Sequence, residues 1–225
     1  MSKELEKIID YHFNDVELLE TALTHSSMQK SHVNNERLEF LGDRVLGLAV
    51  ADTLYIKFNK EDEGKLAKRH TALVRRDALF IVAENINIEK FIKLSVSEKK
   101  SGGLKKKTIL SNTIEAIIGA IYVDGGYSEA YKFVEKFWKE MLNNQEVPPE
   151  DAKSSLQEWA QSRSLPLPTY KLIKKVGNDH SPEFEIECFV EKLGSTTATA
   201  SSKKKAEKLC AIKLLEKIKK EQQNG

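Results

Sequence analysis

The first 142 residues show a helical spacing of hydrophobic positions. Between Leu5 and Leu142, apolar residues recur every three or four positions, and few stretches alternate with the two-residue period of a strand. The clearest interruption is KKSGGLKKK, residues 99–107, where two glycines disfavour a helix and five lysines oppose burial. The pattern therefore predicts an all-helical N-terminal domain with a mobile, exposed basic loop.

A change of composition after Leu142 predicts a domain boundary. The segment NNQEVPPEDAK, residues 143–153, is polar, and its adjacent prolines, Pro148 and Pro149, cannot continue a helix. A chain of 225 residues, 40% of them hydrophobic, can build two modest cores. We expect a first domain at 1–146, a linker at 147–152 and a second domain at 153–221.

The hydrophobic pattern of the second domain changes from helix to strand and back to helix. Residues that carry it are, in chain order, Leu156, Trp159, Ala160 and Arg163 on a first helix, Tyr170, Leu172 and Val176 on a strand, Phe184, Ile186, Cys188 and Val190 on a second strand, Ser195–Ser201 as a weaker third strand, and Ala206, Leu209, Ile212 and Leu215 facing inward on a last helix. Prolines at 166 and 168 end the first helix. The predicted order is α-β-β-β-α.

Composition gives no sign of a membrane protein or of disulfide bonding. No apolar run approaches the roughly 20 residues of a membrane span, and the charged start MSKELEKIIDYH is unlike a secretory signal. Cys188 and Cys210 stand in apolar contexts without a second Cys or His at metal-ligand spacing. We expect a cytoplasmic protein, with no membrane partner, whose thiols are buried and reduced.

The basic character of the chain is confined to its second part. Formal net charge is only +2, which alone does not indicate a nucleic-acid binder. Residues 1–150 carry 22 Lys and Arg against 24 Asp and Glu, whereas residues 151–225 carry 14 against 10. The excess of basic residues therefore belongs to the second part of the chain.

A long predicted helix at 34–55 presents a strip of carboxylates. Its expected core side comprises Leu38, Leu41, Val45, Leu48 and Ala49. On another face, Glu36, Glu39 and Asp43 follow the spacing i, i+3, i+7, so three like charges share about two turns. The strip is either a solvated acidic face, partly neutralised by Arg37 and Arg44, or a site that holds a cation.

A second predicted helix, at 108–124, buries polar groups. It is apolar almost all round, and Gly119 with Ala120 permits close contact with another helix. Asn112 and Glu115 lie one turn apart on one of its faces. An ionised, buried Glu is costly unless it is paired or bound to metal. A hydrogen bond to an arginine or to backbone is the alternative to a metal.

Side-by-side packing of these two helices would create a pocket lined by oxygen atoms. Glu39, Asp43, Asn112 and Glu115 would converge there. Oxygen ligands without His or Cys suit Mg²⁺ or Mn²⁺ rather than zinc. Spacing alone also places Glu63, in EDEGKL, near the same cleft.

Three segments resemble the signature of bacterial ribonuclease III, and the resemblance extends along essentially the whole chain. They are NERLEFLGD at 35–43, DEGKL at 62–66 and IEAIIGAIYVDGG at 114–126. The resemblance implies a multidomain α and α+β protein, with an all-α endonuclease domain before a double-stranded-RNA-binding domain. It implies that Asp43 and Glu115 are the active-site pair and that Glu39 and Asn112 complete the Mg²⁺ site. Glu36 and Glu63 would line the same valley and assist substrate or second-metal binding.

The implied activity is hydrolysis of double-stranded RNA, including ribosomal RNA precursors and other structured transcripts, to 5′-phosphate and 3′-hydroxyl ends. The family acts as a homodimer, which implies staggered cuts with short 3′ overhangs. Phe40 projects beside the carboxylate strip, and burial either against a partner subunit or under another loop of the same chain would explain it. No motif for a small-molecule substrate is present, and His25, in LTHSS, is expected to have a structural role.

One residue departs from the family pattern, which usually has Asp where this chain has Asn112. An amide oxygen can ligate Mg²⁺ but adds no charge, so we expect weaker metal binding that millimolar Mg²⁺, or Mn²⁺, overcomes. The rival interpretation is a double-stranded-RNA-binding regulator with impaired catalysis. A di-metal redox bundle is a third, weaker interpretation, because the Glu-x-x-His motifs of such bundles are missing from the sequence.

The second domain resembles the double-stranded-RNA-binding domain. Matching segments, in order, are DAKSSLQEWAQSR, LPLPTY, GNDHSPEF and SKKKAEKLCA. The resemblance places Gln157 and Glu158 in one minor groove and His180 in the next. Lys203, Lys204 and Lys205 would bind phosphates at a helix N-terminus, although a solvated lysine cluster is the alternative. Two departures are alanines at 198 and 200, where glycine is common, and Asn178, where proline is usual.

Overall fold

The computed structural model describes residues 2–28, 33–144, 152–177 and 182–223. The chain divides into two compact units, Met1–Pro149 and Glu150–Gly225. Because the predicted linker coincides largely with undescribed residues, its limits stay a prediction, although Ala152 already belongs to a helix. Each unit has a hydrophobic core of its own.

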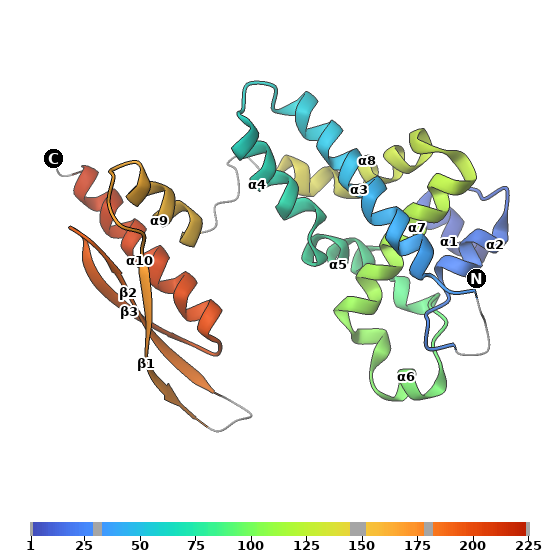
Figure 1. The fold of residues 1–225 in the computed structure, drawn as a ribbon. Coiled ribbons are helices and arrows are strands. Elements are labelled where there is room, and N and C mark those ends of the chain that lie inside the picture. Colours follow the sequence, from blue (N-terminus) through green and yellow to red (C-terminus); the bar gives the residue numbers. More distant parts are fainter. Residues whose placement is uncertain (1, 29–32, 145–151, 178–181, 224–225) are drawn as a thin grey trace. The chain divides into compact units, whose positions relative to one another are not determined.

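The regular secondary structure described in the first unit is helical, apart from an isolated bridge between Thr24 and Lys93 (Figure 1). Its elements are α1 (Ser2–Ile9), α2 (Val16–Ala22), α3 (Glu36–Lys57), α4 (Glu63–Val74), α5 (Arg76–Asn85), the 3₁₀ turn η1 (Ile88–Lys90), α6 (Val96–Lys100), the 3₁₀ turn η2 (Gly103–Lys105), α7 (Lys107–Gly125) and α8 (Tyr127–Asn143). Helix α7 is buried on almost every side, as its sequence predicts, and α3 packs along it more extensively than any other described pair of helices does. The predicted all-α nuclease-type fold is confirmed.

Two glycines let the backbones of α3 and α7 touch. A Cβ atom built on Gly42 would lie 1.7 Å from the carbonyl oxygen of Glu115, and one built on Gly119 would lie 2.2 Å from that of Leu38. Both distances are far inside van der Waals contact, so only glycine fits at either position. The crossing therefore fixes how the two helices present their side chains.

Two details of the helical unit differ from the sequence prediction. Leu48 is 58% exposed, and Leu46 and Val50 are buried instead, because α3 packs against α4 and α8 as well as α7 and its buried arc is rotated. The segment 99–107 is not one exposed loop. Gly103 is buried, and the ammonium of Lys106 lies 2.7 Å from the carboxylate of Glu98.

The second unit is a three-stranded antiparallel sheet with two helices on one face (Figure 1). Its elements are α9 (Ala152–Gln161), β1 (Thr169–Val176), β2 (Glu183–Val190), β3 (Gly194–Ala200) and α10 (Lys203–Gln223), with strand order β1-β2-β3. The predicted α-β-β-β-α order is confirmed. On α10, Ala206 is buried as predicted, but Leu209 is 42% exposed, and the other buried residues are Cys210, Ala211, Leu214 and Ile218.

Both cysteines are buried and free, as expected. Burial raises the pKa of the Cys188 thiol to about 11 and that of Cys210 in the same direction. None of the helices in the described parts of the chain combines the length and hydropathy that a membrane span requires.

The glycine contact makes a stability prediction. Gly42→Ala should lower the free energy of unfolding by roughly 3 kcal/mol or more, because the new methyl group overlaps the α7 backbone and the helices must separate. Urea unfolding followed by circular dichroism measures this loss.

Gly47→Ala is the matched control on the same helix. Its Cβ would meet only the His70 ring, at 3.8 Å, so helix propensity should raise stability by up to about 1 kcal/mol. Equal effects of the two substitutions would contradict the close crossing.

Candidate active site

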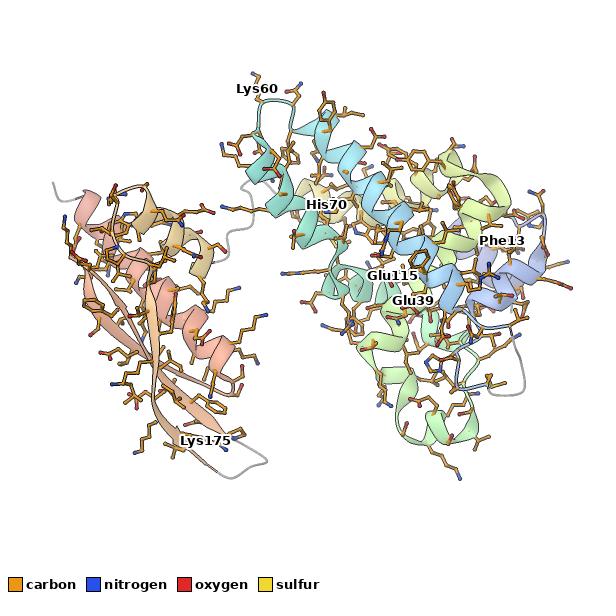
Figure 2. The ribbon with its side chains drawn as sticks, viewed as in Figure 1. Phe13, Glu39, Lys60, His70, Glu115 and Lys175 are labelled. Carbon is orange, nitrogen blue, oxygen red and sulfur yellow. The ribbon has the colours of Figure 1, made fainter. Side chains whose placement is uncertain are left out.

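The carboxylates of α3 and α7 share a cavity of about 570 Å³. Its lining is His25, Ser26, Asn35, Glu36, Glu39, Phe40, Asp43, Arg44, Arg76, Leu79, Ser111, Asn112 and Glu115. Figure 2 shows Glu39 and Glu115 close together where α3 and α7 meet. Of the predicted catalytic and metal-site residues, all four therefore line one cavity, together with Glu36 and Phe40.

The glycine crossing explains this convergence. Gly42 precedes Asp43 directly and touches the backbone of Glu115, so one contact sets both carboxylates at the same level of the two helices. Glu39 lies one turn earlier on α3, and Asn112 lies one turn earlier on α7. A hydrogen bond between Asn112 and Glu39 shows that these two side chains also meet across the crossing.

Asn112 is hydrogen-bonded to Glu39. Its amide nitrogen Nδ2 donates to Glu39 Oε1 at 2.7 Å, which leaves the amide oxygen as the atom that could ligate a cation. Burial raises the pKa of the Glu39 carboxyl, and the Glu36 charge adds to this rise, while the Asn112 bond opposes it. The amide therefore lowers the cost of keeping Glu39 ionised.

Asp43 forms an ion pair with Arg44, one of the two counter-ions that the sequence suggested. The Arg44 guanidinium also lies over the Phe40 ring, 5.1 Å from its centroid. The Asp43 side chain is 41% exposed, so this pair is open to solvent and contributes little stability. Asp43 can exchange this partner for another cation.

Glu115 has a strongly perturbed carboxyl. Burial, reinforced by the Glu39 charge, raises its pKa to about 7, against the opposing charges of Arg76 and Arg44. No hydrogen bond or ion pair to the Glu115 carboxylate is present in the described part of the chain. The alternative that an arginine or backbone group satisfies Glu115 therefore finds no support among those residues.

The donor set fits a hard divalent cation in its chemistry. All candidate ligands are oxygen atoms, and two of the carboxyls have pKa values raised by burial and mutual repulsion, which a cation would relieve. Within the described residues, no three His, Cys, Asp or Glu side chains already form a metal-binding group. The Asp43–Arg44 pair and the Asn112–Glu39 bond would have to rearrange around an ion.

Glu63 lies outside this cavity in the single chain. It begins α4 and lines a separate, largely apolar pocket of about 740 Å³ with residues such as Leu48, Tyr55 and His70. Helix α3 is 22 residues, roughly 33 Å, long, and Glu63 follows its far end. Within one subunit, therefore, Glu63 does not lie near the Glu39 carboxylate, although its spacing in the sequence suggested that it would.

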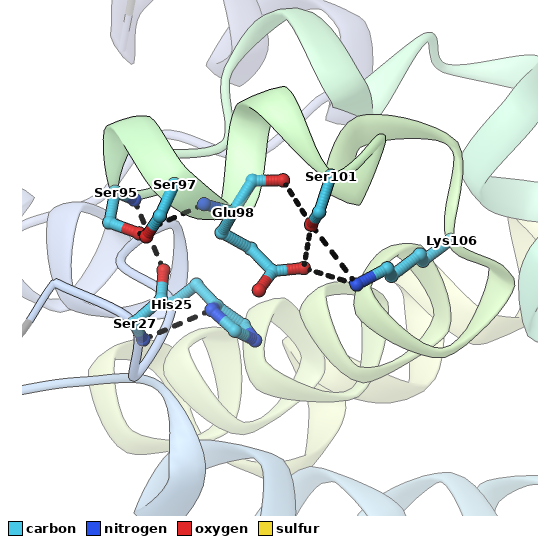
Figure 3. Close-up of polar contacts among 7 residues, drawn as sticks. All are labelled: His25, Ser27, Ser95, Ser97, Glu98, Ser101 and Lys106. Carbon is cyan, nitrogen blue, oxygen red and sulfur yellow. Dashed lines mark hydrogen bonds and ion pairs between the residues drawn. The ribbon is translucent and has the colours of Figure 1, made fainter.

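His25 has the structural hydrogen bonds that the sequence suggested (Figure 3). Its Nδ1 accepts from the Ser27 backbone N–H at 3.1 Å, and Ser27 Oγ accepts from the Ser95 N–H at 3.1 Å. The 24–28 segment is thereby fixed to the start of α6, as the parallel bridge between Thr24 and Lys93 also shows. His25 thus forms part of a rigid cavity rim.

Arg76, at the start of α5, is the charged lining residue that sequence reasoning missed. The Ser111 hydroxyl donates to its backbone carbonyl at 3.0 Å, which ties the beginning of α5 to α7 beside Asn112. No local pattern distinguishes Arg76 from the neighbouring Arg75, and both residues are exposed. Only the packing of α5 on α7 gives it a place in the cavity.

The second unit exposes most of its predicted RNA-binding residues. Gln157 and Glu158 are exposed on α9, and three exposed lysines, 203–205, form the first turn of α10. His180 and Asn178 lie outside the described residues. Ala198 is only 6% exposed and belongs to the core, so its methyl group, absent from glycine, fills space in the core.

Comparisons with known proteins agree with both units. Residues 15–142 match the family described as Ribonuclease-III-like, and residues 152–218 match the Double-stranded RNA binding motif. The protein named Ribonuclease 3 from Wolbachia sp. subsp. Drosophila simulans (strain wRi) is 45% identical over 223 residues, 97% of this chain and 96% of that protein. Ribonuclease 3 of Ehrlichia canis (strain Jake) is 43% identical over 97% of this chain and 98% of its own length.

A solved structure extends the comparison to the fold. The nuclease domain of ribonuclease III from Campylobacter jejuni is 44% identical, with a TM-score of 0.60, and the match covers 61% of this chain and 96% of that domain. Fold and cavity thus define a helical nuclease joined to a double-stranded-RNA-binding unit. The chain belongs to the ribonuclease III family and is an endoribonuclease.

The raised pKa of Glu115 predicts a pH dependence of stability. In chelator-treated protein, the free energy of unfolding should fall as pH rises from about 4.5, the ordinary Glu value, to about 7, because the folded state holds the proton longer. The loss attributable to Glu115 should be roughly 2–3 kcal/mol.

Unfolding of wild-type and Glu115→Gln proteins at a series of pH values isolates this contribution. The variant should be the more stable protein near neutral pH, and the difference should vanish toward pH 4.5. If the free energies of unfolding of the two proteins changed in parallel between pH 4.5 and pH 7, the raised pKa would not belong to Glu115.

Proposed function

We propose that this endoribonuclease hydrolyses double-stranded RNA in an Mg²⁺-dependent reaction that leaves 5′-phosphate and 3′-hydroxyl ends. The observation that carries the proposal is the cavity at the α3–α7 crossing, where Glu39, Asp43, Asn112 and Glu115 meet without His or Cys ligands. Mn²⁺, which prefers the same oxygen donors, would substitute for Mg²⁺.

Each side chain has a role that follows from its surroundings. Asp43, Glu115 and Glu39 provide the negative charge that holds the cation, and the Asn112 amide oxygen would complete the set. When bound, the cation neutralises charge on the phosphate and makes a water molecule a better nucleophile. The half-buried position of Glu115 reduces solvent screening, so its charge acts strongly on neighbouring groups.

Homodimerisation is supported by a hydrophobic stripe on α3. Phe40 is 66% exposed although the Arg44 side chain of the same helix lies over its ring. Leu48 and Tyr55 are 58% and 73% exposed and lie on the same side of the helix, at intervals of eight and seven residues. The Campylobacter nuclease domain has a region involved in dimer formation. Two sites in one dimer would cut opposite strands and leave short 3′ overhangs.

The second unit would select duplex RNA by its shape. Such a module reads A-form minor grooves and the phosphates between them, so Gln157 and Glu158 on α9 and the α10 lysines would contact successive parts of one helix. Structured transcripts, ribosomal RNA precursors among them, are the proposed substrates, and the cytoplasm is the proposed location. Glu63 and His180 stay predicted auxiliary and RNA-binding residues.

A cleavage assay tests the proposal. Long duplex RNA incubated with pure protein and Mg²⁺ should yield short fragments with 5′-phosphate ends, and Asp43→Asn should abolish the reaction. Asn112→Asp should lower the Mg²⁺ concentration for half-maximal cleavage by about tenfold, because an added charge strengthens cation binding.

Different outcomes separate the rival interpretations. Retention of duplex without any cutting, at any Mg²⁺ or Mn²⁺ concentration, supports the regulator whose catalysis is lost at Asn112. Rescue of cutting by Asn112→Asp would identify that residue as the cause. An unchanged Mg²⁺ requirement in Asn112→Asp would show that position 112 does not ligate the ion.

The lysines at the start of α10 make a separate prediction about binding. Replacing Lys204 and Lys205 with Gln should weaken duplex binding in chelator and reduce the slope of log affinity against log salt by roughly 1 to 2, because phosphate contacts release counter-ions. Filter binding at several salt concentrations measures the slope. Lys219 and Lys220, exposed near the other end of α10, give a control with the same change in charge, and an equal effect there would indicate a nonspecific lysine cluster.

A further inference from the structure

Arg76 is the cationic cavity residue that the proposed chemistry leaves without a role. Two independent contacts hold its stretch of chain against α7. Ser111 Oγ donates to the Arg76 carbonyl at 3.0 Å, and the Lys107 ammonium lies 2.7 Å from the Asp77 carboxylate. The Cα of Arg76 is therefore fixed beside the turn of α7 that carries Asn112.

The two arginines of the cavity have different surroundings. Arg44 is engaged by the Asp43 carboxylate and lies over the Phe40 ring. The Arg76 side chain lines the same cavity but forms no ion pair or side-chain hydrogen bond with any residue that the structure describes. The nearest acid in sequence, Asp77, is occupied by Lys107. The Arg76 guanidinium is thus available to a ligand.

The charge of Arg76 acts on the reaction centre itself. Burial is the main cause of the raised pKa values of Glu39 and Glu115, and Arg76 opposes the rise at both carboxyls. Arg76 therefore lies near enough to influence the atoms proposed to hold the cation. An anion that contacts Arg76 would lie beside that centre.

We propose that Arg76 forms a phosphate-binding subsite, in which its guanidinium holds a backbone phosphate of the RNA strand being cut. This inference rests on the proposed function. The planar guanidinium offers two parallel N–H donors that match two phosphate oxygens, and a cavity rich in carboxylates needs a cation to admit a polyanion. Arg76 is the described lining residue that has such donors free.

A substitution series tests the subsite. Arg76→Gln should raise the KM for duplex RNA and weaken metal-free binding by at least about tenfold, because the charged hydrogen bonds to the phosphate are lost. Arg76→Lys, which keeps the charge but not the fork, should lose less. Arg75→Gln removes the same charge from the adjacent residue, which does not line the cavity, and should behave as wild type.

Single methylphosphonate substitutions near the cleavage site provide the decisive readout. Removing the charge of the contacted phosphate should weaken wild-type binding by about the same factor and leave Arg76→Gln nearly unaffected, because the contact is already lost. At other phosphates the two proteins should respond alike. If Arg76 merely balanced the charge of Glu115, wild type and Arg76→Gln would respond alike to methylphosphonate at every phosphate. Arg76→Gln would then bind Mg²⁺ more tightly with no change in RNA affinity.

The outcomes separate this inference from the proposed function. Wild-type protein that neither binds nor cuts duplex RNA would remove the function and the subsite together. Wild-type protein that cuts normally, with Arg76→Gln equal to Arg75→Gln at every phosphate, would overturn the subsite alone. If Arg76→Gln did not fold, an unchanged phosphate profile in folded Arg76→Lys would overturn it equally, since a lysine cannot reproduce the two-donor contact.

Discussion

The backbone contact between α3 and α7 is the constraint on which the rest of the nuclease unit depends. Gly42 and Gly119 let two helices approach until one backbone touches the other, and Asp43 and Glu115 are set by that approach. A wider crossing, such as leucine side chains would impose, separates helix axes by about 8–10 Å and would move the carboxylates apart. Stability and the proposed chemistry thus depend on one contact, because the helices that form the core also position the carboxylates proposed to hold the cation.

Gathering carboxylates at this crossing has an electrostatic cost that the fold compensates only in part. The Asn112 amide donates to Glu39 and Arg44 pairs with Asp43, but in the described chain the Glu115 carboxylate lacks a partner. The raised pKa of Glu115 is the consequence of its burial without a partner for its charge. A site with uncompensated negative charge before a ligand arrives is suited to a divalent cation, and the hydrophobic core around α7 supplies the stability that offsets the repulsion.

Sequence patterns predicted what depends on local periodicity and failed where packing between elements decides. The apolar helix around Glu115, the carboxylate strip on α3 and the α-β-β-β-α unit were all predictable, because spacing fixes which residues share a face. Leu48 and Leu209 were placed inward wrongly, since a helix with several neighbours buries a rotated arc. Glu63 was misplaced within one chain because spacing ignores the length of α3. No sequence pattern indicated Arg76, because only the contact of α5 with α7 brings it to the cavity.

The amide at position 112 and the arginine at position 76 change the charge balance of the cavity in the same direction. Asn112 lacks the negative charge of the Asp that the resemblance in sequence led us to expect there, and Arg76 adds a positive charge at the tethered start of α5 beside it. Both residues weaken attraction for a cation, and both ease the entry of a phosphate. Coulomb energies in a partly buried cavity are several times those in water, so under the proposed function the two residues would act on RNA and on a metal ion in opposite senses. In a cavity with this charge balance, unlike one built of carboxylates alone, the bound RNA would supply part of the negative charge that holds the ion.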